Sequence, residues 1–190
     1  MKKTMRVLVG IVGVFAVVVG IKQIASGVRQ MAGKPAPTRP QEVGEKVAVA
    51  AHGCSLRVPR GWTEKQTEQG GIMFVAPKES GYSANLQVFS EPFAQTLREY
   101  VDANISAVKG AAPGAKFVTD APFTTDSGLP AFKTTFGNKF KDLEVAQAMY
   151  FFDGPAGRKI LITTTAPAIH GAELEPLFDA CVKGLTVTPP

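Results

Sequence analysis

The spacing of hydrophobic positions along the chain changes several times, and each spacing predicts a different kind of element. Short runs of alternating or β-branched apolar residues predict seven strands. Segments rich in Gly, Pro, Asp and Ser separate these runs, and the last three separators are short enough to predict an antiparallel meander. The predicted strands are Cys54–Val58, Ile72–Ala76, Asn85–Ser90, Lys116–Ala121, Ala131–Phe136, Glu144–Phe152 and Lys159–Thr165.

Two further segments have helical spacing, with one apolar stripe each. The first is expected to begin at an N-cap on Ser90 and to end at Gly110. The second covers Glu173–Lys183 and contains Pro176, which a helix tolerates only near its start. Each stripe is predicted to cover a face of the sheet, which gives an α+β fold with a central antiparallel sheet. The stripes consist of Phe93, Leu97, Tyr100, Val101, Ile105 and Val108, and of Leu174, Leu177, Phe178, Cys181 and Val182.

The N-terminal part has a different pattern. Residues 7–21 are all apolar or glycine, and three basic residues precede them. We therefore expect residues 1–28 to be a single apolar helix that anchors the chain in the cell membrane, or else a cleaved secretory signal. Residues 29–46 are predicted to be a proline-rich linker, and residues 47–190 a globular domain. Under both interpretations the domain is exported, to the periplasmic or extracellular side.

The charge distribution agrees with this division. The chain has a net charge of +5, but residues 1–44 carry seven Lys or Arg and one Glu, whereas residues 45–190 carry fourteen basic and fifteen acidic residues. A near-neutral domain lacks the basic surface that nucleic-acid binding requires. The expected partners are therefore the membrane, through the N-terminal segment, and an envelope protein, with no nucleic acid.

Both histidines and both cysteines are candidate functional groups. His52, Cys54, His170 and Cys181 are zinc ligands by type, but a helix between residues 170 and 181 would separate its ends by about 16 Å. A nucleophilic Cys54 with His52 as its base is a second alternative. The leading interpretation is a Cys54–Cys181 disulfide between the two ends of the domain, with His52 as a surface or edge residue beside it. No metal site, cofactor or catalytic set is predicted.

Three adjacent aromatic residues mark a candidate groove. Tyr150, Phe151 and Phe152 lie within a predicted strand, so neighbouring side chains must point to opposite faces of the sheet. They either fill the core or leave an aromatic side chain available to a ligand or partner.

The order of features also resembles a known family. The stretch "CSLRVPRGW" contains Pro59, Gly61 and Trp62, and it is followed by "SANLQVFSEPF" with Asn85 and by "KILITTTAP" with Pro167. Over residues 53–187 the chain resembles the PsbP/Mog1/DcrB-like superfamily. This resemblance implies an α/β/α sandwich with a central antiparallel sheet, in which the motif residues are structural. Members act mainly as binding or assembly modules, and they share no catalytic set.

Together these features predict a non-catalytic module of a bacterial cell envelope that binds a protein partner. The first alternative is a domain that binds a lipid or small molecule in a pocket between helix and sheet. The second is a hydrolase of unrecognised type.

Overall fold

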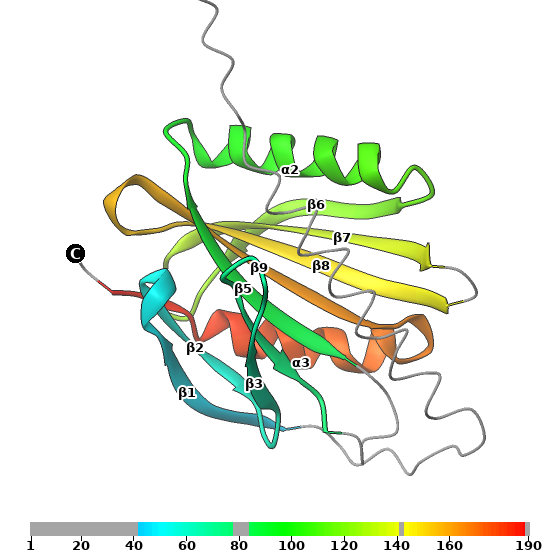
Figure 1. The fold of residues 1–190 in the computed structure, drawn as a ribbon, viewed down its shortest axis with the longest axis horizontal. Helices are drawn as coiled ribbons and strands as arrows, with labels where there is room; N and C mark the ends of the chain where they lie inside the picture. Colours follow the sequence, from blue (N-terminus) through cyan, green and yellow to red (C-terminus); the bar gives the residue numbers. More distant parts are fainter. Residues whose placement is uncertain (1–41, 78–83, 141–142, 189–190) are drawn as a thin grey trace, which may run out of the picture.

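The computed structural model describes residues 42–77, 84–140 and 143–188. These residues form a seven-stranded sheet with the order β3-β4-β5-β9-β8-β7-β6 and a three-stranded sheet with the order β1-β2-β10 (Figure 1). The strands are β1 (Val43–Val49), β2 (Cys54–Pro59), β3 (Thr63–Gln66), β4 (Ile72–Val75), β5 (Asn85–Pro92), β6 (Lys116–Thr124), β7 (Pro130–Phe140), β8 (Leu143–Asp153), β9 (Arg158–Pro167) and β10 (Thr186–Val187). The helices are α2 (Leu97–Ala111) and α3 (Gly171–Lys183), with 3-10 turns η1 (Ala50–His52), η3 (Pro155–Gly157) and η4 (Ala168–His170).

All seven predicted strands are present, as β2 and β4 to β9. Every pairing in the large sheet is antiparallel, and the predicted meander is formed by β6, β7, β8 and β9. The early strand β5 pairs with β9, which places β9 near the middle of the sheet. Residues 159–167 of β9 are accordingly all buried. A strand buried on both faces explains the long uninterrupted run of apolar and Thr residues there.

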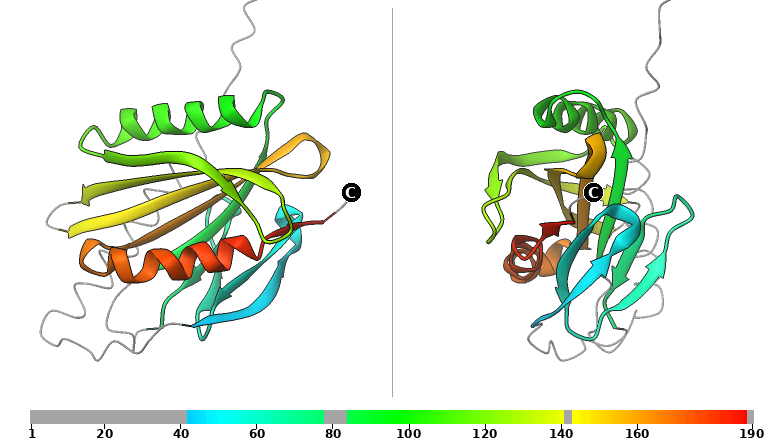
Figure 2. Two further views of the ribbon diagram at one scale, coloured as in Figure 1. Left: turned by 180° about the vertical axis from the view of Figure 1, so that it is seen from behind. Right: turned by 90° about the vertical axis from the view of Figure 1, so that its left-hand side faces the viewer.

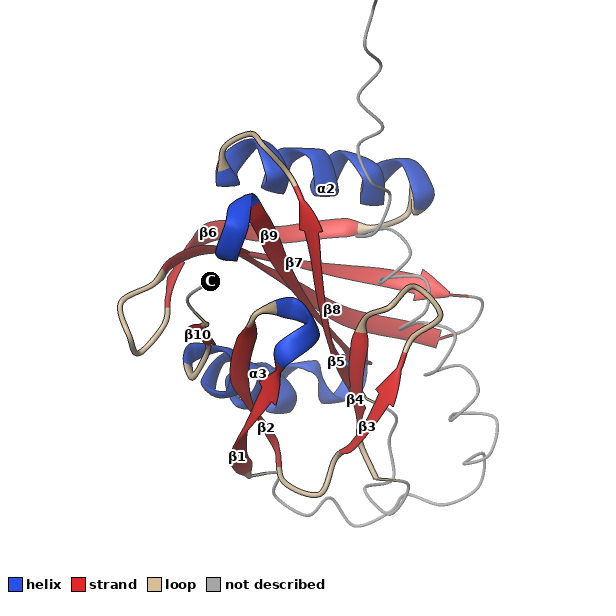
Figure 3. Cartoon of the chain, turned by 60° about the vertical axis from the view of Figure 1, so that its left-hand side comes forward, coloured by secondary structure: helices blue, strands red, loops and turns tan. Residues whose placement is uncertain are grey.

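The two helices lie on opposite sides of the large sheet (Figure 2). Side chains therefore alternate between two cores along β8: Met149 and Phe151 face α2, whereas Tyr150 and Phe152 face α3. The small sheet packs on the α3 side, and Figure 3 shows β1 and β2 beside α3 and away from α2. This arrangement is an α+β fold with a central antiparallel sheet, as predicted.

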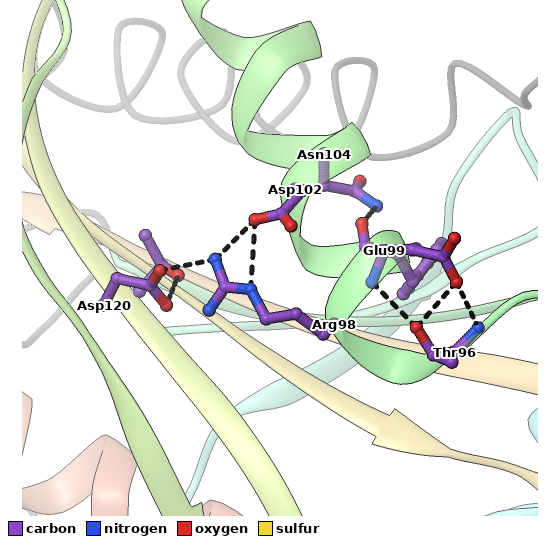
Figure 4. A network of polar contacts seen from close by, with 8 residues as sticks. Thr96, Arg98, Glu99, Asp102, Asn104 and Asp120 are labelled. Carbon is purple, nitrogen blue, oxygen red and sulfur yellow. Dashed lines mark hydrogen bonds and ion pairs between the residues drawn. The ribbon is translucent and has the colours of Figure 1, made fainter.

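The helix α2 begins later than expected. The sequence predicts Ser90 as its N-cap, but β5 continues to Pro92 and the cap is Thr96. The Thr96 hydroxyl accepts a hydrogen bond from the Glu99 amide, and the Glu99 carboxylate accepts one from the Thr96 amide (Figure 4). This capping box satisfies two backbone N–H groups at the start of the helix.

An arginine ties α2 to the edge of the sheet. The Arg98 guanidinium donates to Asp102 on α2 and, at 2.7 Å, to Asp120 on β6 (Figure 4). It also lies over the Phe132 ring at 5.3 Å from the ring centroid. These contacts link the first turn of α2 to β6 and β7.

The predicted N-terminal helix, residues 1–28, lies outside the described residues. Of the predicted linker, residues 29–46, only its last part is described, and β1 already begins there at Val43. The helices among the described residues are all too short or too polar to cross a membrane.

Candidate ligand groove

A groove of about 340 Å³ opens between α3 and the large sheet. Its floor is formed by β7, β8 and β9, one wall by η4 and the first turns of α3, and the opposite rim by Val118 of β6. We call this feature the α3 groove. It is lined by Val118, Thr135, Phe136, Gly137, Val145, Ala146, Gln147, Ala148, Tyr150, Thr164, Ala166, Ala168, Gly171, Ala172, Glu175 and Phe178.

The α3 groove is hollow because small residues from distant parts of the chain meet there. Ala146 and Ala148 of β8 lie beside Ala166 of β9, and Ala172 lies opposite them on α3. At one point the helix touches the sheet: a Cβ atom placed on Gly171 would lie 2.8 Å from the Cβ of Ala146. The glycine therefore allows the close approach of α3 to β8, while the alanines leave the neighbouring space open.

One wall of the groove carries charge. The Tyr150 hydroxyl donates to Asp179 at 2.7 Å, and the Lys133 ammonium donates to Glu175 at 2.7 Å and to Asp179. Burial, together with the neighbouring Asp179 carboxylate, raises the pKa of Tyr150 well above its ordinary value, so its hydroxyl stays protonated. Burial alone would lower the pKa of Lys133, but the bonds to Asp179 and Glu175 outweigh this effect and raise it.

Two exposed aliphatic residues belong to segments that line the groove. Val118 is 75 % exposed and Ile169 is 87 % exposed, and these are the large hydrophobic residues that stand out as exposed in the described part of the chain. A shift of register between Phe117 and Thr119 places Val118 in an irregular position of β6. Ile169 lies in η4, next to the lining residue Ala168. Exposed apolar side chains beside an apolar hollow are typical of a binding surface.

The prediction that three adjacent aromatic residues mark a groove is correct for one of them. Tyr150, Phe151 and Phe152 do alternate between the two faces, but all three are fully buried. Only Tyr150 lines the groove. The small residues that create the space were missed, because a gap left by alanines becomes visible only when β7, β8, β9 and α3 are brought together.

The predicted disulfide is absent. Cys54 opens β2, Cys181 lies in α3, and both are free thiols within the same core cluster. Burial raises the pKa of each thiol to about 12, so both are protonated at neutral pH. A protonated, buried thiol is neither an effective nucleophile nor a metal ligand. In the part of the chain that is described, no three His, Cys, Asp or Glu residues are grouped to hold a metal ion.

His52, expected to be a surface or edge residue, is buried. Its Nδ1 lies 3.0 Å from the Ser90 hydroxyl, which also receives hydrogen bonds from the Arg158 guanidinium. Burial, and then the nearby positive charge of Arg158, lower the pKa of His52. The imidazole is therefore held neutral in a structural contact between η1 and β5, and it does not pair with Cys54.

The motif residues have structural positions. Gly61 has φ of +79°, which favours glycine in the turn between β2 and β3. Trp62 is buried and packs edge-on against Phe178 at a centroid distance of 5.9 Å. Pro59 ends β2 and Pro167 ends β9. Asn85 is buried at the start of β5.

Asn85 belongs to a group of buried polar residues on the opposite face of the sheet, which sequence reasoning did not identify. The side chains of Gln147 and Thr165 are hydrogen-bonded at 3.2 Å, and those of Gln87 and Asn85 at 3.1 Å. Thr163 lies between these pairs, opposite Gln87 in the register. Along the strands these residues alternate with side chains that face α3, so they form an uncharged layer on the α2 side of the sheet, and of this layer Gln147 also borders the α3 groove.

Comparisons with known proteins show the class of fold. No protein-family model matches the sequence, and no curated protein sequence does so. The structure, however, matches solved structures of PsbP/Mog1-like proteins, and the chain therefore has a PsbP/Mog1-like fold. Identities of 12–15 % to these structures establish the fold alone.

Three of the matching structures come from different organisms. Cyanobacterial PsbP (CyanoP) of Synechocystis sp. PCC 6803 is 14 % identical, with a TM-score of 0.57 over 82 % of this chain and 98 % of that one. The Ran-binding protein Mog1p of Saccharomyces cerevisiae is 12 % identical, with a TM-score of 0.57 over 78 % and 97 %. LpqN of Mycobacterium tuberculosis, involved in cell envelope biogenesis, is 15 % identical, with a TM-score of 0.56 over 82 % and 100 %.

Proposed function

We propose that this protein is a non-catalytic module of the cell envelope that binds a protein partner through the α3 groove. The observation that carries the proposal is the apolar hollow between α3 and the sheet, which has the exposed Val118 in its lining and the exposed Ile169 directly after its lining residue Ala168. Covering this surface would remove apolar area from water, which is the main favourable contribution to association.

The descriptions of the similar structures support a binding role. Mog1p is described as binding Ran, a protein, and LpqN as involved in cell envelope biogenesis. Neither description names a catalysed reaction. The α3 groove itself is lined mainly by aliphatic, aromatic and hydroxyl side chains, together with Gln147 and with Glu175, which accepts a hydrogen bond from Lys133.

The envelope assignment rests on the sequence. The apolar run of residues 7–21, with basic residues before it, supports an N-terminal membrane anchor with an exported domain. A secreted or periplasmic protein, after cleavage of a signal, is the alternative. In both cases the α3 groove would face an envelope protein.

A lipid or small molecule is the second candidate occupant of the same groove. The volume of about 340 Å³ lies at the lower end of the range for ligand pockets. The alanine-rich floor would accommodate an acyl chain or a flat apolar molecule.

The test is in-cell crosslinking of the full-length chain, followed by purification and intact-mass analysis. Ala172→Leu places a larger side chain in the groove, and Ala111→Leu is a matched control at an exposed position of α2. We expect a protein partner that is recovered with wild type and Ala111→Leu, and is reduced at least severalfold with Ala172→Leu. A retained lipid or small molecule would favour the second candidate, and equal recovery with both variants would contradict the groove as the binding site. The mass also shows whether residues 1–28 are retained.

A further inference from the structure

We infer that the α3 groove recognises a polypeptide segment that places a lysine or arginine beside its apolar anchor. This inference rests on the proposed function and specifies the chemistry of the partner. Three features of the described residues carry it: the balance of charge on one wall, the accessibility of that charge, and the strand edge that borders the groove.

The charged wall contains more carboxylates than cations. Glu175 and Asp179 share the single ammonium group of Lys133, at 2.7 and 2.8 Å. The cluster therefore contains one more carboxylate than cation. Glu173, two residues before Glu175 on α3, points to another side of the helix and lies 3.5 Å from the imidazole of His170, so it is not counted in this cluster.

The excess charge is accessible, whereas the cation is not. The Glu175 side chain is 52 % exposed and lines the groove, but the Lys133 side chain is only 14 % exposed beneath it. A ligand at this wall thus meets carboxylate oxygen first. A basic group would be attracted there, and the carboxylate or phosphate of an anionic lipid would be repelled.

The border of the groove favours a polypeptide over a small cationic molecule. Val118 belongs to β6, an edge strand of the seven-stranded sheet. Among the described residues, β6 pairs only with β7. An edge strand presents backbone N–H and C=O groups that an extended segment can use. Val118 lines the groove, and the exposed Ile169 follows the lining residue Ala168, so an extended segment would have apolar surface to contact beyond the hollow itself.

The experiment is site-specific photo-crosslinking of the full-length chain in the cells that make it. A photoreactive amino acid replaces Ile169, which is exposed and lies beside the groove, and in the control it replaces Ala111 on α2. The crosslinked product is identified by mass spectrometry. We expect a polypeptide adduct at position 169, absent at position 111, with a Lys or Arg within a few residues of the crosslinked site.

Charge variants then test the pairing. Glu175→Gln is expected to lower the adduct yield about two- to fivefold, the range for an exposed charge pair, and Glu175→Lys to lower it further. Glu64→Gln and Glu64→Lys, on the exposed strand β3 at the opposite edge, are the controls and are expected to have no effect. Thermal unfolding of each variant shows whether it folds.

The outcomes separate this inference from the proposed function. A polypeptide adduct without a nearby basic residue, or one insensitive to both Glu175 variants, overturns the inference and leaves the groove as the partner site. A lipid adduct at position 169 overturns the inference in favour of the second candidate. No adduct above the control at position 111 overturns both.

Discussion

His52 lies between η1 and β5, with its imidazole buried against Ser90 and near the guanidinium of Arg158. A histidine in a β-rich segment next to a cysteine suggested a surface position, because nothing local in the sequence shows that β5 and β9 cover it. The contact joins residues 38 positions apart. Its chemical environment is therefore a property of the tertiary structure.

This burial predicts a pH dependence of stability. The pKa of His52 in the folded state is lowered from 6.5, so the unfolded state binds the proton more tightly. The stabilisation from the neutral imidazole is then present above pH 6.5 and is lost as the pH falls from 6.5 through the lower folded value. Urea unfolding between about pH 7.5 and 5.5 should show wild type losing more stability than His52→Gln.

Glu91 changes stability in the opposite direction. Burial raises its pKa, despite a hydrogen bond from Tyr100, so its contribution is present at low pH and is lost as the pH rises through the folded value. The difference between wild type and His52→Gln isolates the histidine, because Glu91 is common to both. Parallel pH profiles for the two proteins would contradict the account of His52.

The two cysteines give a second prediction at the scale of single residues. Because both thiols are free, buried and protonated, neither should react with an alkylating reagent in the folded protein. After unfolding in denaturant without reductant, mass spectrometry should show two alkyl groups per chain. Unfolded protein whose mass shows no alkyl group would contain a disulfide, and this result would contradict the free thiols.

At the scale of elements, the strands with an apolar face were predictable and the polar ones were not. The strand β3 has the sequence Thr-Glu-Lys-Gln and is exposed throughout, so it has no buried face to produce alternation. β10 has two residues, and β1 begins within the proline-rich stretch. All three are short or lie near an edge. Pairing with a neighbour defines β3 and β10, whereas β1 does have alternating valines, Val47 and Val49, that face the core and was missed because it begins inside the predicted linker.

The N-cap of α2 was predicted at Ser90, but the structure has it at Thr96. Ser90 and Thr96 are both caps by type, but only Thr96 has Glu three positions later. Thr96→Ala removes the side-chain half of the capping box and should lower the free energy of unfolding by about 1 kcal/mol. Chemical denaturation measures this difference. Thr124→Ala, at an exposed end of β6, is the control, and equal effects of both variants would argue against the cap.

The contact between α3 and β8 gives a steric prediction. A Cβ atom on Gly171 would lie 2.8 Å from the Cβ of Ala146, so Gly171→Ala should destabilise the protein by about 1–3 kcal/mol through a shift of the helix start. Gly114→Ala, where a Cβ meets open space, is the matched control. Part of the loss should be recovered in Gly171→Ala/Ala146→Gly, as measured by thermal unfolding. Additive losses in the double variant would contradict a direct clash.

At the scale of the whole molecule, the sequence predicted the class of fold but not the site. Two apolar stripes and seven strands suffice to define helices on both sides of an antiparallel sheet. The α3 groove arises instead because small side chains leave space where β7, β8 and β9 meet α3. These small residues are Ala146, Ala148, Ala166 and Ala172. Of the predicted aromatic residues, Tyr150 alone contributes. Small residues carry no sequence signal of their own, and long-range packing decides where a hollow forms.

The measurement that tests the central claim most directly is amide hydrogen exchange of the full-length protein, alone and with the partner recovered by crosslinking. If the α3 groove is the binding site, the partner should slow exchange in residues 143–150 and 166–178, which include its floor and helical wall. Exchange in α2, on the other side of the sheet, should be unchanged. Protection confined to α2 or to β3 and β4, with none at the groove, would contradict the account.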